Sequence, residues 1–200
     1  MTQPGTGRRR GARRRDELEP PSTGAAAQDA EPDAEEVART IALRQLTAAP
    51  RSRAQLEEAM ARRDVPADVA ARVLDRFTEV GLVDDAAYAE MLVRTRHAER
   101  GLARRALAQE LRRKGIEPEV AALALEQVDE SDEHAAARRL VEKKARSTRG
   151  LDAQVRRRRL AGMLARKGFA GGVAMRAIDE VLAEEGVDPL AAPGDWDALD

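Results

Sequence analysis

The sequence predicts an all-α protein built from three tandem three-helix repeats. Apolar residues recur at helical spacing, and one set of six returns 51 residues earlier and 53 residues later. Aromatic residues are only 2% of the chain, so the core is expected to consist of Ala, Leu and Val in closely packed helices. The aligned sets are Leu107, Leu111, Ile116, Val120, Leu125 and Val128; Leu56, Met60, Val65, Val69, Leu74 and Phe77; and Leu160, Leu164, Phe169, Val173, Ile178 and Val181.

The first repeat is predicted to cover residues 35–83 and to hold three helices. Pro50 ends the first helix, because proline has no amide proton and cannot continue it. Ser52 has a side chain suited to cap the second helix, and Pro66 fits the first turn of the third. Gly81 then closes the unit.

The second repeat, residues 84–131, opens with two neighbouring carboxylates. Asp84 is a suitable N-cap, and Asp85 would meet the positive end of the helix dipole. Paired carboxylates can also serve acid–base chemistry or hold a metal, but no His or third carboxylate with ligand spacing lies beside these two. The central helix, residues 104–114, is expected to end at Gly115 in the left-handed conformation that glycine adopts freely.

The third repeat, residues 132–185, is expected to begin at Asp132 and Glu133. Four extra residues precede its arginine run, Arg156–Arg159, whose side chains must point in all directions around a helix. Gly171 and Gly172 replace the proline of the other two turns. This junction is therefore predicted to be the most flexible of the three.

The two ends of the chain lack any apolar period. Residues 1–34 hold two arginine triplets followed by an acidic stretch, and residues 186–200 form an acidic tail that contains Trp196. Both should be disordered, because neither buries enough apolar surface to offset the entropy of ordering. The triplets either contact nucleic acid without specificity or simply remain solvated.

Several classes of protein are excluded by what the sequence lacks. It has no cysteine for disulfides or thiolate sites, and no apolar run long enough for a membrane span. It has no phosphate-binding loop or catalytic motif, and His97 and His134 stand in polar surroundings where exposure is the simplest expectation. We therefore expect a cytoplasmic monomer that is not an enzyme and uses no cofactor or metal.

Positive charge is concentrated in the middle of the chain. Residues 92–168 contain 20 Lys and Arg against 11 Asp and Glu, a net charge of +9, whereas the whole chain is at −1. Solvated helix faces account for part of this surplus, and a polyanion or an acidic partner would account for the rest. The candidate partner- or DNA-binding residues are Arg104, Arg105, Arg112, Arg113, Lys114, Arg156, Arg157, Arg158, Arg159, Arg166 and Lys167.

Cations at the start of a helix oppose its dipole, so those at Arg104, Arg105 and Arg156–Arg159 suggest that a partner binds them. On this hypothesis, replacing Arg156, Arg157 and Arg159 by Glu removes binding without changing the helical content.

Three segments in order, Arg51–Leu56, Gly81–Ala89 and Glu110–Ile116, resemble the RecX family of regulatory proteins. The resemblance covers roughly residues 37–185. It implies an elongated, curved stack of repeats that acts without catalysis. It also implies binding in the groove of the RecA filament on single-stranded DNA, which restrains filament assembly, ATP hydrolysis, strand exchange and coprotease activity.

The sequence departs from the family pattern at three places. Asp64 replaces a glycine, Gly171 and Gly172 form the third turn, and Ala136 stands where the second repeat has Tyr88. These differences concern the packing of the outer repeats.

Two other functions compete with this interpretation. Helix-turn-helix units with basic first helices are also typical of a DNA-binding transcription regulator. The helix that would read bases, residues 118–128, is instead acidic and apolar and almost lacks Arg, Asn and Gln. A plain helical scaffold is the third possibility.

Overall fold

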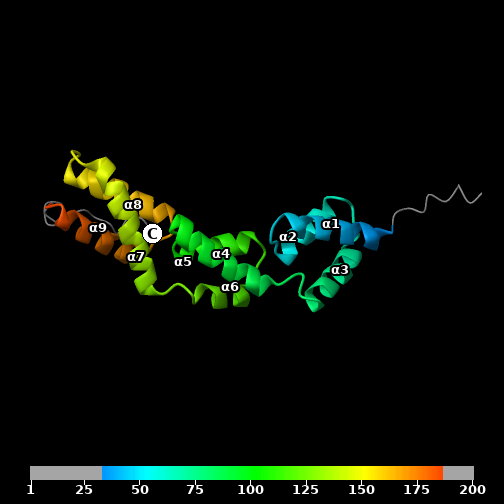
Figure 1. The fold of residues 1–200 in the computed structure, drawn as a ribbon. Helices are drawn as coiled ribbons and strands as arrows, with labels where there is room; N and C mark the ends of the chain where they lie inside the picture. Colours follow the sequence, from blue (N-terminus) through cyan, green and yellow to red (C-terminus); the bar gives the residue numbers. More distant parts are fainter. Residues whose placement is uncertain (1–32, 187–200) are drawn as a thin grey trace, which may run out of the picture. The chain divides into compact units, whose positions relative to one another are not determined.

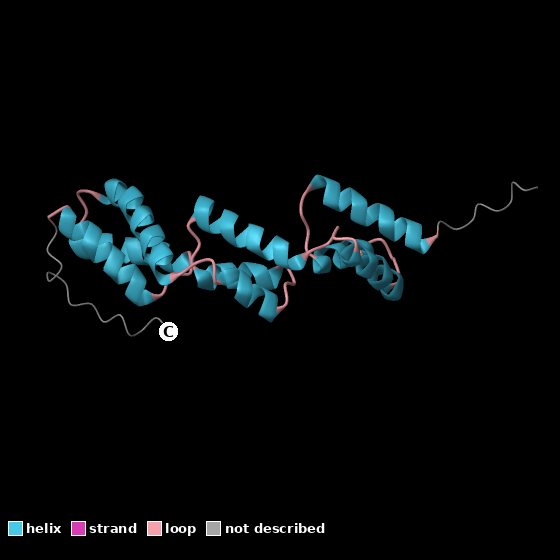
Figure 2. Ribbon diagram, turned by 60° about the horizontal axis from the view of Figure 1, so that its bottom comes forward, coloured by secondary structure: helices cyan, strands magenta, loops and turns pink. Residues whose placement is uncertain are grey.

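The computed structural model describes residues 33–186, and this part of the chain is helical throughout, with loops between the helices (Figures 1 and 2). The predictions for the N-terminal arm before residue 33, for the acidic tail after residue 186 and for Trp196 lie outside the described residues. No helix among the described residues is both long and apolar enough to span a membrane. The helices are α1 (Ala34–Ala48), α2 (Arg53–Ala61), α3 (Ala67–Glu79), α4 (Asp85–Arg100), α5 (Arg104–Arg113), α6 (Pro118–Leu125), α7 (Glu130–Ala145), the short 3₁₀ helix η1 (Arg146–Thr148), α8 (Ala153–Arg166) and α9 (Gly171–Glu184).

The helices form three domains of three α-helices, each with its own apolar core: α1–α3, α4–α6 and α7–α9. All eighteen aligned apolar positions belong to these cores, and only Val120 and Val173 remain partly exposed. Leu56, Leu107 and Leu160, which are equivalent to one another, are all fully buried. Burying each such side chain contributes roughly 1.5–3 kcal/mol, so the repeated apolar set explains the repeated fold.

The polar residues that cap the helices lie mainly where the sequence predicts them. Ser52 forms a complete capping box with Gln55, and the Asp84 carboxylate accepts from the Ala87 amide at 2.9 Å. Gly115 adopts the left-handed conformation, with a φ of 71°. The third domain differs from the prediction, because α7 begins at Glu130, capped by Asp129, and Asp132 is the third residue of its first turn.

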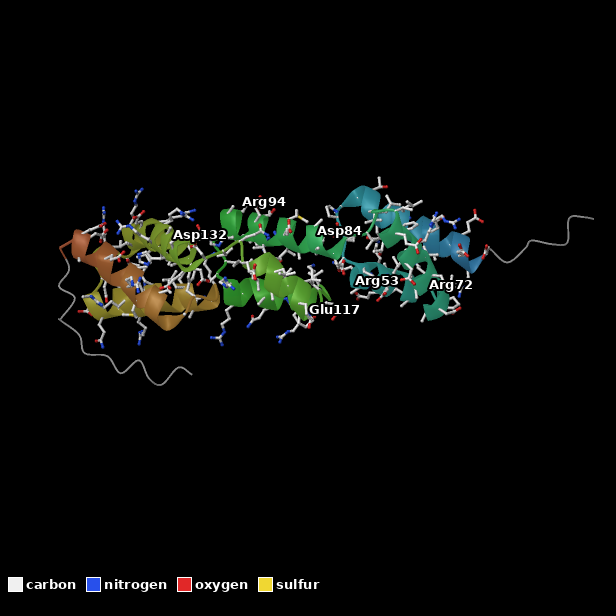
Figure 3. The ribbon with its side chains drawn as sticks, turned by 90° about the horizontal axis from the view of Figure 1, so that it is seen from below. Arg53, Arg72, Asp84, Arg94, Glu117 and Asp132 are labelled. Carbon is white, nitrogen blue, oxygen red and sulfur yellow. The ribbon has the colours of Figure 1, made fainter. Side chains whose placement is uncertain are left out.

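Consecutive domains are joined in the same way twice. At the first joint, the Ser52 hydroxyl donates to the Lys114 carbonyl at 2.5 Å, and Asp85 accepts from the Arg53 amide at 2.8 Å. Figure 3 labels Arg53 and Asp84, which belong to the two domains that meet here. At this joint, the start of the first domain's middle helix, α2, contacts two parts of the second domain: the end of α5 and the first turn of α4.

The second joint repeats this arrangement with different side chains. The Ala103 amide donates to the Lys167 carbonyl at 3.0 Å, and Glu133 accepts from the Arg104 amide at 2.6 Å. Thus α2 contacts the end of α5, and α5 contacts the end of α8. The first-turn carboxylates of α4 and α7 cap a helix of the preceding domain as well as complementing their own helix.

Glycine is required at both joints by close contact between the domains. A Cβ on Gly115 would lie 2.3 Å from the Ala54 Cβ, and one on Gly168 would lie 2.5 Å from the Ala106 amide nitrogen. Asp64 occupies the equivalent turn of the first domain, also at a positive φ of 59°, and is exposed. This departure from the family pattern therefore lies on a turn that joins no other domain in the described chain.

Candidate binding surface

Arg156 and Arg157 are buried, each only 5% exposed, although both were predicted to contact a partner. The Arg156 guanidinium pairs with Glu185 and donates to the Thr148 hydroxyl at 3.3 Å, and Arg157 pairs with Asp179. The prediction is wrong about their exposure, because both side chains are used inside the third domain.

The Arg157–Asp179 pair is a repeated element of the fold. At the equivalent positions of the first domain, Arg53 pairs with Asp75 at 2.7 Å. The second domain has Arg104 at this place, and its guanidinium donates to the Val128 carbonyl at 2.8 Å. Arg104 is therefore also used within the protein, at least in part. The sequence does contain the signal, since Arg53, Arg104 and Arg157 are in register, as are Asp75, Glu126 and Asp179.

Glu185 holds the end of α9 against α8 and η1. It accepts hydrogen bonds from Arg156 and, at 3.1 Å, from Arg149. The hydrogen bond from Arg156 is the main reason that the pKa of Glu185 lies below its usual range. Replacing Arg156 by Glu would place two carboxylates together, so we now expect such a variant to destabilise the third domain instead of leaving its helices unchanged.

The remaining arginines of the run line an open groove in the third domain. Arg158, Arg159 and Arg166 lie on one face of α8 and surround a volume of about 540 Å³ together with Lys144 of α7. We call this set of four cations the basic groove. No carboxylate lines it, and none of its cations forms an ion pair with any residue in 33–186. Ser147 and Thr148 also line the groove, although the Thr148 hydroxyl is buried and hydrogen-bonded to the Ala145 carbonyl and Arg156.

Sequence reasoning missed Lys144, because cations in the last turn of a helix have an ordinary explanation in the helix dipole. The structure shows that Lys144 also faces α8 across the groove. The useful signal was the pair of lysines Lys143 and Lys144, followed by two hydroxyl residues just before the extra residues of the third repeat.

The predicted residues of the second domain are not brought into the basic groove. Arg105, Arg112 and Arg113 are exposed on α5. Arg105 and Arg113 hold the positions equivalent to Arg158 and Arg166, but α5 lines no part of that groove. Lys114 and Lys167 are half-buried at the two joints instead.

Each histidine contacts a group of its own domain. Both are half-buried rather than exposed: His97 Nδ1 lies 3.0 Å from the Leu102 carbonyl, and His134 Nε2 lies 3.0 Å from Glu180. Within the described residues, no three His, Asp or Glu side chains gather in a way that could hold a metal ion.

Three family models match the chain, one for each domain. They are the first, second and third three-helix domains of RecX, over residues 38–77, 84–125 and 131–178. They agree with the prediction of an all-α fold made of three three-helix repeats.

Relatives and solved structures give the same result. The chain is 53% identical to the regulatory protein RecX of Streptomyces coelicolor over 156 residues, which are 78% of this chain and 83% of the relative. It is 46% identical to RecX of Mycolicibacterium smegmatis, over 76% of this chain and 82% of that one. A crystal structure of RecX from Lactobacillus salivarius has a TM-score of 0.69 at 22% identity and covers 76% of this chain and 98% of its own, which supports the fold. The chain belongs to the RecX family of regulatory proteins.

Proposed function

We propose that this protein binds the RecA recombinase filament on single-stranded DNA and restrains its assembly, ATP hydrolysis, strand exchange and coprotease activity. It does so by occupying the filament, without catalysing a reaction or using a cofactor. Membership of a family of regulatory proteins supports this function, and the proposed partner implies a cytoplasmic location.

The basic groove is the surface that we propose binds the filament. Four cations face an open volume of about 540 Å³ with no carboxylate among them, so their positive potential is directed to solvent. Such a surface attracts an acidic protein groove or the phosphates within it, and the attraction weakens as salt rises. Neighbouring Arg156 and Arg157 are neutralised internally, which leaves α8 with one free basic face.

The structure gives less support to a sequence-specific transcription regulator. Apart from Gln127, the exposed side chains of and around α6, including Glu117, Glu119 and Leu123, are acidic or apolar. Reading base edges in the major groove needs donors such as Arg, Asn and Gln. A negatively charged helix would instead be repelled by the DNA phosphates.

The test is DNA-dependent ATP hydrolysis by RecA, with and without this protein. The Arg158→Glu, Arg159→Glu, Arg166→Glu triple variant should need at least about tenfold more protein for the same inhibition, equivalent to roughly 1.4 kcal/mol of lost binding. A matched control reverses three exposed arginines elsewhere, Arg44, Arg63 and Arg94, which line no part of the groove. That control carries the same change in net charge but leaves the groove intact, so it should inhibit within about twofold of the wild type.

Two results would count against the proposal in different ways. Failure of the wild-type protein to inhibit RecA would reject the function. Wild-type inhibition by the groove triple variant, with helical content unchanged, would keep the function and remove the groove from it.

A further inference from the structure

Each interdomain joint contains a pocket lined by cations from both domains. The first joint pocket has a volume of about 240 Å³, and its lining residues are Pro50, Arg51, Gln55, Tyr88, Met91, Leu92, Thr95, Arg96 and Lys114. The second joint pocket has a volume of about 570 Å³, and its lining residues are Glu99, Arg100, Leu102, Leu140, Lys143, Lys144, Ser147, Met163 and Lys167.

The two pockets are copies of one another in the repeat register. Lys114 and Lys167 are equivalent residues at the ends of α5 and α8. Leu92 of α4 corresponds to Leu140 of α7, so equivalent helices form the floor of both. In each copy the preceding domain contributes lining residues from around the start of its middle helix, Pro50, Arg51 and Gln55 in the first pocket and Leu102 in the second.

Positive charge dominates both pockets. The first has Arg51, Arg96 and Lys114 without a lining carboxylate, and only Arg96 has an ion-pair partner among residues 33–186, namely Glu110 at 2.9 Å. The second is lined by four cations, Arg100, Lys143, Lys144 and Lys167, and by a single acid, Glu99. Equivalent helices thus place an excess of cations at both joints, although only the lysine at the helix end is the same residue in each.

We propose that each joint pocket binds a phosphate group of single-stranded nucleic acid. The inference rests on the proposed function, since the DNA in the filament would be the strand that is bound. The second joint pocket adjoins the basic groove and shares Lys144 with it, whereas the first joint pocket shares no residue with that groove. It also predicts binding by this protein alone, without RecA.

An unpaired buried group supports an anionic ligand in the first pocket. The Arg51 Nε atom is buried and has no hydrogen-bond partner within the described chain. Buried polar atoms are nearly always paired, and this N–H belongs to a side chain that lines the pocket, so a bound acceptor would satisfy it. Phosphate suits this role, because it accepts from a guanidinium and an ammonium group at the same time.

The other lining groups favour a nucleic acid over an acidic peptide. The half-buried Tyr88 ring lies beside the first pocket's cations, where a base could stack on it. Thr95 and Ser147 add a hydroxyl group to each pocket, and hydroxyl groups commonly contact phosphate and sugar. With so few aromatic residues, recognition would depend on the backbone and not on the base sequence.

Binding of a labelled single-stranded oligonucleotide to the full chain, followed by fluorescence anisotropy over a salt series, tests the inference. The Lys114→Ala, Lys167→Ala double variant should bind about tenfold more weakly, and its log–log salt slope should be smaller in magnitude by roughly 1.4, because two phosphate contacts are lost. Arg44→Ala, Arg63→Ala is the matched control and should bind as the wild type does, since these exposed arginines line neither pocket.

A second double variant guards against a structural effect. The Lys167 ammonium also donates to the Arg100 carbonyl, so its removal could alter the second joint itself. Arg51→Gln with Lys143→Gln changes one cation in each pocket without touching that contact, and it should weaken binding in the same way. Circular dichroism should show unchanged helical content in both variants.

Three outcomes would overturn the inference: no oligonucleotide binding by the wild-type protein, equal binding by the wild type and both double variants, or equal competition by polyglutamate of matched charge. The last would show an acidic protein surface as the ligand. Inhibition of RecA by the wild type alongside any of these would leave the proposed function standing, whereas oligonucleotide binding without inhibition would reject that function alone.

Discussion

The first and third domains share a core and differ on the surface. Leu56 and Leu160 are fully buried at equivalent positions, and Arg53–Asp75 matches Arg157–Asp179 as a structural ion pair. On the outer face of α2, Glu58 and Arg62 pair with each other at 2.7 Å, whereas Ala54 in the same row packs at the first joint. The same face of α8 reads Arg158, Gly162 and Arg166, with no ion pair to any described residue.

This comparison separates what the fold needs from what a partner can use. The apolar residues and one ion pair recur because each domain must bury the same helix face. The outer face has no such requirement and can change from self-neutralised to positive without affecting the core. An arginine of one domain is therefore a candidate for binding only when the residues at the equivalent positions of the other domains do not form contacts that hold those domains together.

The largest loss of stability should come from reversing the charge of an arginine that is buried in an ion pair. Arg156→Glu buries a carboxylate against Glu185 and should destabilise the third domain by about 3–5 kcal/mol. Thermal unfolding measures this, and Arg158→Glu, two residues along the same helix, is the control, with an expected change under about 0.5 kcal/mol. Similar unfolding curves for the two variants would contradict the division of the arginine run.

Equivalent core residues should be equally important in every domain. Met60, Leu111 and Leu164 are all fully buried, so substitution of each by Ala should cost roughly 2–5 kcal/mol through lost burial and a cavity. Arg112→Ala, on the exposed side of α5, should cost well under about 1 kcal/mol. Chemical denaturation gives these values, and a Leu111→Ala cost as small as that of Arg112→Ala would mean that the inward and outward faces are wrongly assigned.

The glycine at a joint should matter more than a glycine at a free turn. Gly115→Ala and Gly81→Ala both place a side chain at positive φ, which costs about 1–2 kcal/mol. At Gly115 the new Cβ also meets Ala54, adding roughly 1–3 kcal/mol of overpacking, whereas nothing lies within 4 Å at Gly81. Equal melting temperatures for the two variants would indicate that the first joint is loose.

The smallest expected effect is a loss of stability in acid that concerns the third domain and not the first. The pKa of Glu185 is lowered by Arg156, so its ionised form stabilises the folded state. This stabilisation is present above the unfolded pKa of about 4.3 and is lost as pH falls through the lower folded value. Glycine stands at the equivalent place in the first domain, Gly81, which therefore lacks this contribution. Unfolding measured from neutral to acidic pH should show a shallower acid loss in Glu185→Gln than in the wild type.

Much of the fold could be predicted because its signals are local or periodic. The apolar positions recur with the helical repeat, and Ser52, Asp84 and Gly115 act within a few residues of the helix ends that they define. The cap of α7 lies three residues before the predicted one, because Asp129 and Asp132 are both acceptable caps and only the formed capping box distinguishes them.

The binding surface could be predicted only in part, because a run of charged residues does not show which side chains point to solvent and which point into the domain. Arg156 and Arg158 are two positions apart, and a helix rotates neighbouring side chains by about 100° per residue. Which of them points inward depends on where Glu185 lies, 29 residues further along the chain. The arginine run by itself determined that α8 has a strongly basic face.

By itself, the sequence determined three repeated apolar cores, the capped helix ends and the excess of positive charge, since each follows from residue type and spacing. Tertiary structure alone decided that Arg156 is internal, that Lys144 faces α8, and that cations gather at the joints. The reason is that burial and pairing depend on residues far apart in the chain, as between Ser52 and Lys114, which contact each other across 62 positions.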